Sequence, residues 1–307
     1  MRNLIIVSIA ALAAVVALSP AVLGQAAGGA NQGQGDRTPR PSIAPPTGWN
    51  SCPRCQNNED RRQARTTYKV EGHPFDPHDL SGVWGYNGVG GDRGPTFRTP
   101  PALTPWGKER REATFGEKNA KGEVVRSKDT SGLGGGSEIN CDPMGYPRLY
   151  AYNYGFEFMM HSDRVLQFFE LNHTWRTIWT DGRKLPDNPP EPHWLGWNIA
   201  HWEGDTFVIE SNGFDDRSWI DGTVPDGGWP HSDEMRVVER YRRANYGTLE
   251  VQITIIDPKT YAEPWVTQQA TISLVPGTEL WENFCAPSDY STFNSDIFLP
   301  ATGAVKK

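Results

Sequence analysis

Short runs of alternating apolar and polar residues recur along this chain from Leu80 onward, and this period-2 pattern constrains the fold more than any other feature. The runs lie at residues 80–86, 155–161, 164–171, 174–180, 195–202, 205–211, 248–256, 264–275 and 279–285. Short turns separate many of them, and the chain holds 32 glycines and 25 prolines. This pattern predicts an all-β fold built as a single antiparallel meander. Because an open meander leaves unpaired edges, we expect a closed or nearly closed β-barrel with long rim loops.

The stretch from Gly228 to Arg243 carries signals for two different structures. Ser232, which is followed by two acidic residues, and the basic pair at 242–243 are typical of the two ends of a helix. Apolar and charged residues also alternate from Met235 to residue 242, and the next run follows almost at once. We predict a strand here, with a helix as the alternative.

The first part of the chain indicates export. Arg2 precedes an apolar run that ends in small residues near Gly24, which is the pattern of a secretory signal peptide. Residues 25–67 are rich in Gly, Gln, Pro and Ser, and such a segment buries too little apolar surface to offset its ordering entropy. We therefore expect a signal peptide at 1–24, a disordered or loosely ordered linker at 25–67, a β-barrel domain at 68–299 and a flexible tail at 300–307. The expected location is the periplasm or the extracellular space.

The net charge bears on the partners. The formal charge is −7, and it becomes −8 when Arg2 leaves with the signal peptide. An acidic chain is poorly suited to nucleic acid or to an anionic membrane surface. The apolar run at the start is also short for a transmembrane anchor. We expect no nucleic-acid partner and no membrane insertion, and the sequence does not indicate an oligomeric state.

The chain has four cysteines: Cys52, Cys55, Cys141 and Cys285. In an oxidising compartment an even number suggests disulfides, and three pairings are possible. We favour Cys141–Cys285, which would tie an early loop to the last strand, with Cys52–Cys55 as a local pair.

Two resemblances extend the fold prediction. Gly82-x-Trp84 on the first predicted strand looks like the signature that begins lipocalin-type barrels, where the tryptophan plugs the closed end, and it implies a calycin-like barrel. A wider set of motifs resembles a family of uncharacterised exported proteins from environmental bacteria: "CDPMGYPR", "RTIWTDGRKLP", "GWNIAHWEGDTFVIESNGF", "HSDEMRVVERYRR", "IIDPKTYAEPW" and "LWENFC". The second resemblance spans most of residues 80–285 and implies a shared fold, but it carries no established activity. The sequence departs from that family's pattern at Leu185 and His201.

Two long insertions, at 87–137 and 180–192, lack any periodicity. Loops of this length in a compact domain often form functional rims, and disorder is the alternative.

His231 is the candidate catalytic residue. It lies where a loop enters a predicted strand, and an imidazole there could act as a general acid or base if a carboxylate oriented its second nitrogen. The preceding loop supplies Asp215, Asp216 and Asp221 for that purpose. A structural, hydrogen-bonded histidine is the alternative explanation.

Charged and aromatic residues on the predicted strands and loops form a candidate ligand-binding set. Inside a barrel Arg176 and Glu239 would have to pair, because an unpaired buried charge is very costly. The resulting patch could hold a carboxylate or a polar head group, whereas a purely structural salt bridge would explain the same residues. The candidate ligand-binding residues are Arg148, Arg176, Trp179, Trp197, Trp229, Glu239 and Arg240.

The 12 Trp, 10 Tyr and 12 Phe side chains exceed what a core of this size requires. Such rings stack well on apolar or ring-shaped ligands, although barrel packing explains many of them. The sequence therefore predicts a small-molecule-binding barrel without a cofactor or metal. The alternative is a cofactor-independent hydrolase or lyase, in which His231 and an aspartate transfer protons and Arg176 or Arg240 stabilises anionic charge. The sequence leaves open whether the protein is an enzyme.

Overall fold

The computed structural model describes residues 68–85, 94–95, 97, 99, 101–114, 117–122, 124–126, 141–152, 154–220, 228–280 and 283–285. The expected signal peptide, linker and tail, together with Cys52, Cys55 and Asp221, lie outside these residues.

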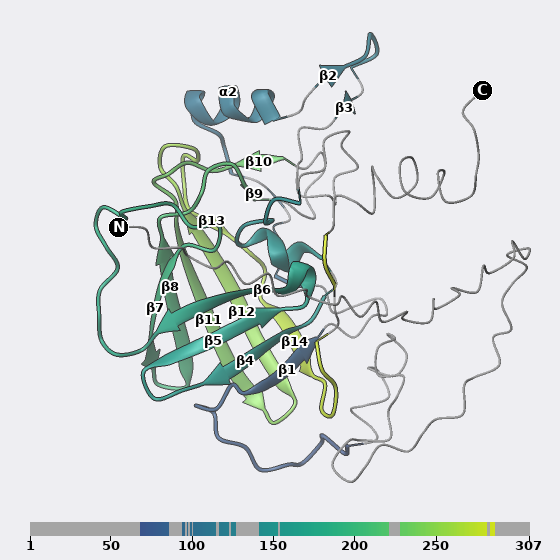
Figure 1. Cartoon of the computed structure of the whole chain (residues 1–307), viewed down its shortest axis with the longest axis vertical. Coiled ribbons are helices and arrows are strands. Elements are labelled where there is room, and N and C mark those ends of the chain that lie inside the picture. Colours follow the sequence, from purple (N-terminus) through teal and green to yellow (C-terminus); the bar gives the residue numbers. More distant parts are fainter. Residues whose placement is uncertain are drawn as a thin grey trace, which may run out of the picture. The chain divides into compact units, whose positions relative to one another are not determined.

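Nine strands form a closed barrel (Figure 1). They are β1 (Gly82–Gly85), β4 (Phe156–Met160), β5 (Arg164–Phe169), β6 (Thr174–Trp179), β7 (Trp197–Glu203), β8 (Thr206–Asn212), β11 (Arg236–Asn245), β12 (Thr248–Ile256) and β14 (Ala270–Leu274). Around the ring the order is β11, β8, β7, β6, β5, β4, β1, β14 and β12, and β12 pairs with β11 to close it. The predicted all-β, calycin-like barrel is confirmed.

One neighbouring pair departs from the antiparallel pattern. β6 and β7 run parallel and share a single register pair, Trp179 with Ile199, whereas the other ring pairs are antiparallel. Parallel neighbours need a connection that returns to the starting end of the sheet. Residues 180–196 make this return outside the strands, so the insertion at 180–192 belongs to a crossover (Figure 1).

The barrel core follows from the alternation of side chains along each strand. In β12 Leu249, Val251, Ile253 and Ile255 point inward and are at most 1% exposed, while most residues between them are partly exposed. β11 alternates in the same way, so the strand prediction for this stretch is confirmed and the helix alternative is wrong. The inward face of β11 includes Glu239, so the interior is not purely apolar.

Trp84 on β1 is part of the buried core. Its side chain is fully buried, and its indole nitrogen donates to the carbonyl of Leu80 at 2.8 Å. The guanidinium of Arg243 lies 5.4 Å from the indole ring centre and donates to the carbonyls of Asp79 and Tyr246. These contacts hold the start of β1 against the end of β11.

The insertion at 87–137, expected to be irregular, contains the α-helix α2 (Pro105–Thr114) and a small β-hairpin, so that expectation is wrong in part. The start of α2 has recognisable signals: the Thr104 hydroxyl accepts the Gly107 amide at 3.0 Å, and Pro105 occupies the first helical position. The Arg111 guanidinium lies 3.7 Å from the ring centre of Trp229.

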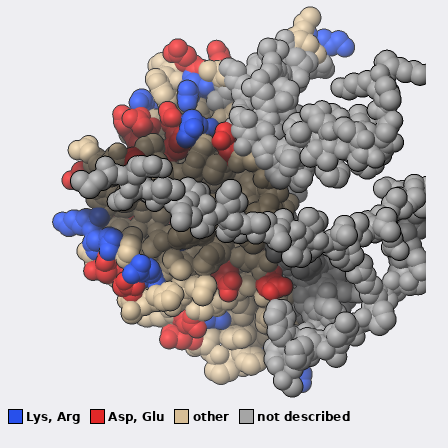
Figure 2. Space-filling model, viewed as in Figure 1, with Lys and Arg blue, Asp and Glu red and all other residues tan. Residues whose placement is uncertain are grey.

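Several shorter elements complete the described part of the chain. They are β2 (Glu117–Lys118), β3 (Val124–Arg126), β9 (Trp219–Ile220), β10 (Trp229–Pro230), β13 (Trp265–Val266), and the 3-10 turns η1 (Arg148–Ala151) and η2 (Leu171–His173). None of the helices in these ranges is long and apolar enough to cross a membrane. On the face shown in Figure 2, acidic and basic side chains lie interspersed.

Two strand predictions near the end of the barrel domain need correction. The run at 264–275 is divided into β13 and β14, because the side chain of Thr267 accepts the amide of Ile253 at 2.9 Å in place of a regular ladder bond. The described residues of 279–285 form no strand, so β14 closes the ring instead. Asn283 is held through its side chain, which accepts the amide of Asn172.

The predicted disulfide between Cys141 and Cys285 is present, with the two Cα atoms 5.4 Å apart. It ties an early loop to the segment beyond the last strand rather than to a strand, because the chain leaves the barrel after β14.

Candidate functional site

A buried ion pair lies inside the barrel. Arg176 on β6 donates from Nη1 and Nη2 to the two carboxylate oxygens of Glu239 on β11, at 2.8 and 2.7 Å. Both side chains are at most 1% exposed. Arg176 also donates to Gln167 at 2.8 Å and to Asn198 at 3.2 Å, and its guanidinium lies 4.1 Å from the ring centre of Tyr146. The expected pairing of Arg176 with Glu239 is therefore present.

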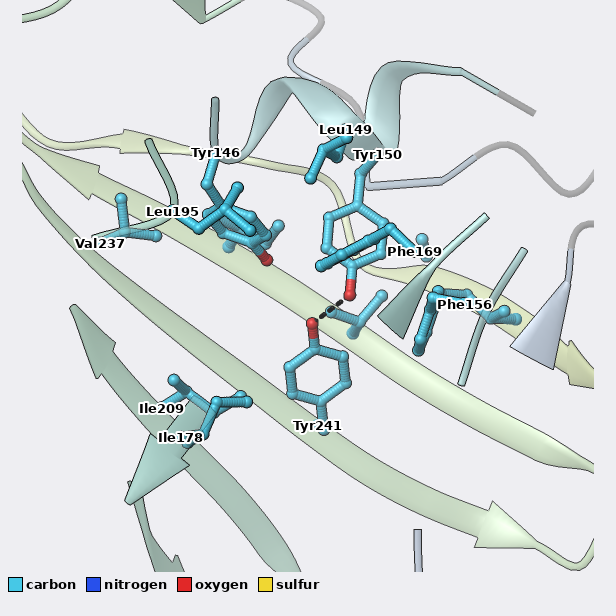
Figure 3. Close-up of a cluster of buried hydrophobic side chains, with 14 of the residues drawn as sticks. Tyr146, Leu149, Tyr150, Phe156, Phe169, Ile178, Leu195, Ile209, Val237 and Tyr241 are labelled. Atoms are coloured by element: carbon cyan, nitrogen blue, oxygen red, sulfur yellow. Dashed lines mark hydrogen bonds between the residues drawn. The ribbon is translucent and has the colours of Figure 1, made fainter. Parts of the chain in front are cut away.

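Three tyrosines, Tyr146, Tyr150 and Tyr241, extend this pair into a network. The hydroxyls of Tyr146 and Tyr241 both donate to Glu239 Oε2. The hydroxyls of Tyr150 and Tyr241 are 2.5 Å apart, and they meet in the middle of the aromatic cluster (Figure 3). Gln167 donates to the Tyr150 oxygen at 2.6 Å. Tyr241 gives its one hydroxyl proton to Glu239, so Tyr150 must be the donor between Tyr150 and Tyr241. The hydrogen bonds therefore form a closed ring, which runs from Arg176 through Gln167, Tyr150, Tyr241 and Glu239 back to Arg176.

The protonation states of the network follow from burial and charge. Burial, followed by the nearby Glu239 carboxylate, raises the pKa of each of the three tyrosines above its ordinary value, so all three remain neutral donors. Burial alone would lower the pKa of Arg176, but the Glu239 carboxylate raises it above its ordinary value. The network is thus a neutral assembly of satisfied groups at neutral pH.

An open cleft of about 830 Å³ lies where the crossover 180–196 passes β6 and the start of β7. Its walls include four tryptophans: Trp175, Trp179, Trp194 and Trp197. They also include four prolines: Pro143, Pro186, Pro190 and Pro192. β6 and β7 share only one register pair, so the cleft reaches the inward-facing side chains Arg176 and Asn198.

Neighbouring residues contact the tryptophans that line the cleft. Trp197 donates from its indole nitrogen to the carbonyl of Glu191 at 3.1 Å, and the His193 ring stacks on it at 4.4 Å. The ring of Trp179 lies between two guanidinium groups, those of Arg164 at 4.3 Å and Arg183 at 3.5 Å.

The structure brings only three of the predicted ligand-binding residues to this cleft: Arg176, Trp179 and Trp197. Glu239 is behind Arg176, while its neighbour Arg240 points to the outer face and pairs with Glu203 at 2.7 Å, because adjacent strand residues face opposite sides.

Arg148 and Trp229 lie away from the cleft lining. The Arg148 guanidinium is 5.5 Å from the ring centre of Trp219, and Trp229 is buried beside α2. Their ligand-binding role stays a prediction.

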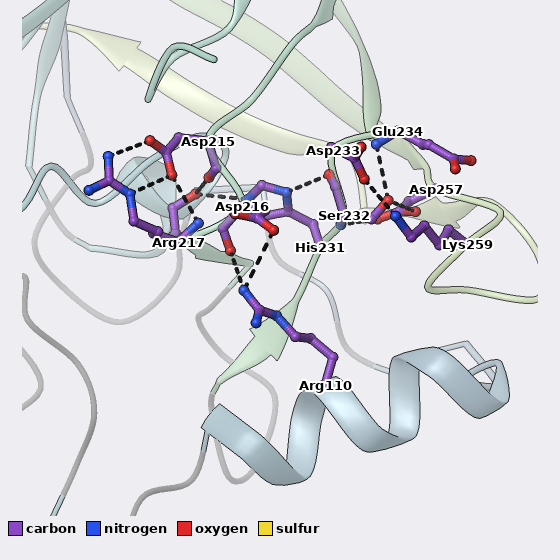
Figure 4. A network of polar contacts seen from close by, with 11 residues as sticks. Arg110, Asp215, Asp216, Arg217, His231, Ser232, Asp233, Glu234, Asp257 and Lys259 are labelled. Atoms are coloured by element: carbon purple, nitrogen blue, oxygen red, sulfur yellow. Dashed lines mark hydrogen bonds and ion pairs between the residues drawn. The ribbon is translucent and has the colours of Figure 1, made fainter. Parts of the chain in front are cut away.

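His231 is fully buried (Figure 4). Its Nδ1 lies 3.0 Å from the carbonyl of Ser232, so this nitrogen carries the proton, and Nε2 accepts from the Ser218 hydroxyl at 2.8 Å. Burial lowers the pKa of His231, although the hydrogen bond to Ser232 and the Asp257 carboxylate oppose this shift. The imidazole is therefore neutral at pH 7 and is held on both nitrogens.

The carboxylates expected beside His231 are bound to arginines instead. Arg217 contacts both oxygens of Asp215, at 2.9 and 2.6 Å, and lowers its pKa. Asp216 faces Arg110 at 3.6 Å (Figure 4). Among the described residues no carboxylate hydrogen-bonds the His231 ring, and Asp221 is not among them. The acid–base role of His231 stays a prediction.

Sequence reasoning missed the residues that line most of the cleft. Trp175, Arg183, Lys184 and His193 were not candidates, although the unusual length of the insertion at 180–192 marked the region. No group of three or more His, Cys, Asp or Glu side chains in the described ranges is placed to hold a metal ion.

Comparisons with known proteins found no match among family models, curated proteins or solved structures. The fold and its buried aromatic clusters define a closed β-barrel of a kind compatible with ligand binding.

Proposed function

We propose that this protein binds an apolar or ring-shaped small molecule in the cleft between the crossover 180–196 and strands β6 and β7. The observation that carries the proposal is a cleft of about 830 Å³ with four tryptophans in its walls. Sites for small molecules commonly have volumes of roughly 300–1,000 Å³ and are lined mainly by apolar and aromatic side chains.

The cleft is a better candidate than the barrel interior. Inside the barrel Arg176, Glu239 and the three tyrosines bond to one another and are almost completely buried. A ligand entering there would have to break a satisfied polar network, which is costly in a low-dielectric interior. The cleft offers aromatic surface without that cost.

The test is calorimetric titration with a panel of ring compounds against wild-type protein and Trp175→Ala. Trp175 lines the cleft and is 55% exposed, so its removal costs the fold little. We expect the variant to bind a hit about tenfold more weakly, as for the loss of one aromatic contact. Met159→Ala is the control, because Met159 is 44% exposed but does not line the cleft. The proposal would be contradicted if both variants bound the compound equally weakly, or if Trp175→Ala bound it with the affinity of the wild type.

We also propose that the protein works outside the cytoplasm and belongs with lipocalin-like barrels. The Cys141–Cys285 disulfide supports an oxidising compartment, and the buried Trp84 under Arg243 supports the second proposal. Mass spectrometry of protein from the producing cell tests the first: a chain beginning near residue 25 is expected, and an intact leader would refute it.

A further inference from the structure

The charged side chains that line the cleft are basic. Apart from His193, they are Arg176, Arg183 and Lys184, and among the described residues no acidic side chain lines the cleft, although carboxylates lie behind this lining. This contrasts with the chain as a whole, which carries a formal charge of −7. Basic and aromatic side chains that line one cleft of an acidic protein indicate that, among ring-shaped ligands, the cleft favours anionic ones.

Arg176 is not the group that would meet a ligand's charge. It already donates to Glu239, Gln167 and Asn198, and its side chain is 1% exposed. Its charge is neutralised by the carboxylate that it holds.

Arg183 is also engaged. It binds Asp181 through Nε at 2.9 Å and Nη2 at 2.6 Å, and its guanidinium lies 3.5 Å from the ring centre of Trp179. The hydrogen bonds from Arg183 lower the pKa of Asp181, so this carboxylate stays ionised and keeps Arg183 occupied.

Lys184 is the remaining cation. It lines the cleft, it is exposed, and within the described part of the chain it has no carboxylate partner. An exposed ammonium group that binds none of the described carboxylates is available to pair with an anionic group on a ligand.

We propose that the ligand is an aromatic acid, with its ring against Trp175 on the outer face of β6 and its anionic group paired with Lys184. This inference rests on the proposed function and names the class of ligand for the same cleft. Trp175 and Trp179 are four residues apart on one strand face, a span of roughly 13 Å. Two guanidinium groups already cover the Trp179 ring, whereas Trp175 is 55% exposed, so Trp175 is the ring of this strand that is open to a ligand. Lys184 follows closely after the Trp179 end, so the anion lies at that end and the ring extends toward Trp175.

The exposure of Lys184 determines how strongly the cleft should prefer an anion over its neutral analogue. Ion pairs between exposed groups are weak, so Lys184 should favour an anion over its neutral analogue by about three- to five-fold. Salt screens such a pair, so the preference should decrease at high ionic strength, whereas ring binding should not.

The experiment is calorimetric titration of 2-naphthoate and of its neutral analogue 2-naphthalenemethanol, at low and high salt. Three proteins are compared: wild type, Lys184→Gln and Lys108→Gln. Lys108 is an exposed lysine on α2 that does not line the cleft, so it serves as the matched control. We expect wild type and Lys108→Gln to prefer the acid at low salt, and Lys184→Gln to bind both compounds equally. Unchanged binding of the alcohol to Lys184→Gln shows that the cleft is intact.

Two results would overturn the inference in distinguishable ways. If wild type binds both compounds equally, the ligand class is wrong; if Lys184→Gln keeps the preference for the acid, Lys184 is not the group that pairs with the anion. In both cases the cleft still binds a ring compound, so the proposed function stands. If neither compound binds wild type, the proposed function fails together with the inference.

Discussion

Removing the charge of Glu239 is the most direct test of how the barrel interior is stabilised. In Glu239→Gln the side chain keeps its shape, but Arg176 loses the carboxylate that accepts two of its hydrogen bonds at 2.8 and 2.7 Å. The new amide also places donors toward the hydroxyls of Tyr146 and Tyr241, which donate to this group in the wild type. Removing one partner of a buried pair costs about 3–5 kcal/mol, because an uncompensated charge remains in the interior.

Guanidinium chloride unfolding, followed by far-UV circular dichroism and tryptophan fluorescence, measures this cost. We expect Glu239→Gln to lower the free energy of unfolding by about 3–5 kcal/mol with little change in the m-value. Glu203→Gln is the control: Glu203 also binds an arginine, Arg240, but is half exposed, so its loss should cost less than about 1 kcal/mol. If the two variants lose similar amounts, the interior pair does not stabilise the barrel as argued.

Three further outcomes are expected. Since the pKa of each of the three barrel tyrosines is raised above 10.0, the unfolded chain loses these protons first, and stability should fall as pH rises above about 10. The NMR signals of these three rings should show ionisation only with unfolding, and ionisation in the folded protein would contradict this. The pKa of His231 is lowered from 6.5 in the folded protein, so as pH falls the unfolded chain binds this proton first. The free energy of unfolding should therefore decrease by up to about 1.4 kcal/mol per pH unit below 6.5. NMR showing a charged His231 ring at pH 7 would refute this prediction. Cys285→Ser should lower the free energy of unfolding by about 5 kcal/mol, because the disulfide closes a loop with a sequence separation of 144. An unchanged denaturation midpoint would contradict that value.

Most of the barrel could be predicted because strand alternation reports local burial. The β7–β8 hairpin is a clear case: two alternating runs flank a short turn, where Gly204 has a positive φ of 57° that glycine adopts readily. The parallel pairing of β6 with β7 could not be predicted in this way, because alternation shows which side chains face inward but not which strand lies alongside.

The sequence predicted the candidate site only where a residue's position on a strand was enough to determine its contacts. A charged residue on an inward face needs a partner, and Arg176 and Glu239 do pair. The predicted loop does reach His231, but it contributes the Ser218 hydroxyl, which also lies 3.1 Å from the carbonyl of Asp215, and not a carboxylate. Which side chain of a loop meets the ring depends on the path of the loop, and the residue types alone do not give that path. The cleft was missed for a similar reason: its walls come from a crossover whose path is set by topology.

The closure of the ring by β1 and β14 has a consequence for the order of folding. Trp84 pairs with Leu274, so the first strand of the barrel cannot find one of its two neighbours until almost the whole domain has been made. Pairings between segments so far apart in sequence form slowly, because the entropy of closing the intervening chain is lost before the contact forms. Until then β1 and β12 each expose an unpaired edge, and an incomplete chain is vulnerable to joining another copy through those edges.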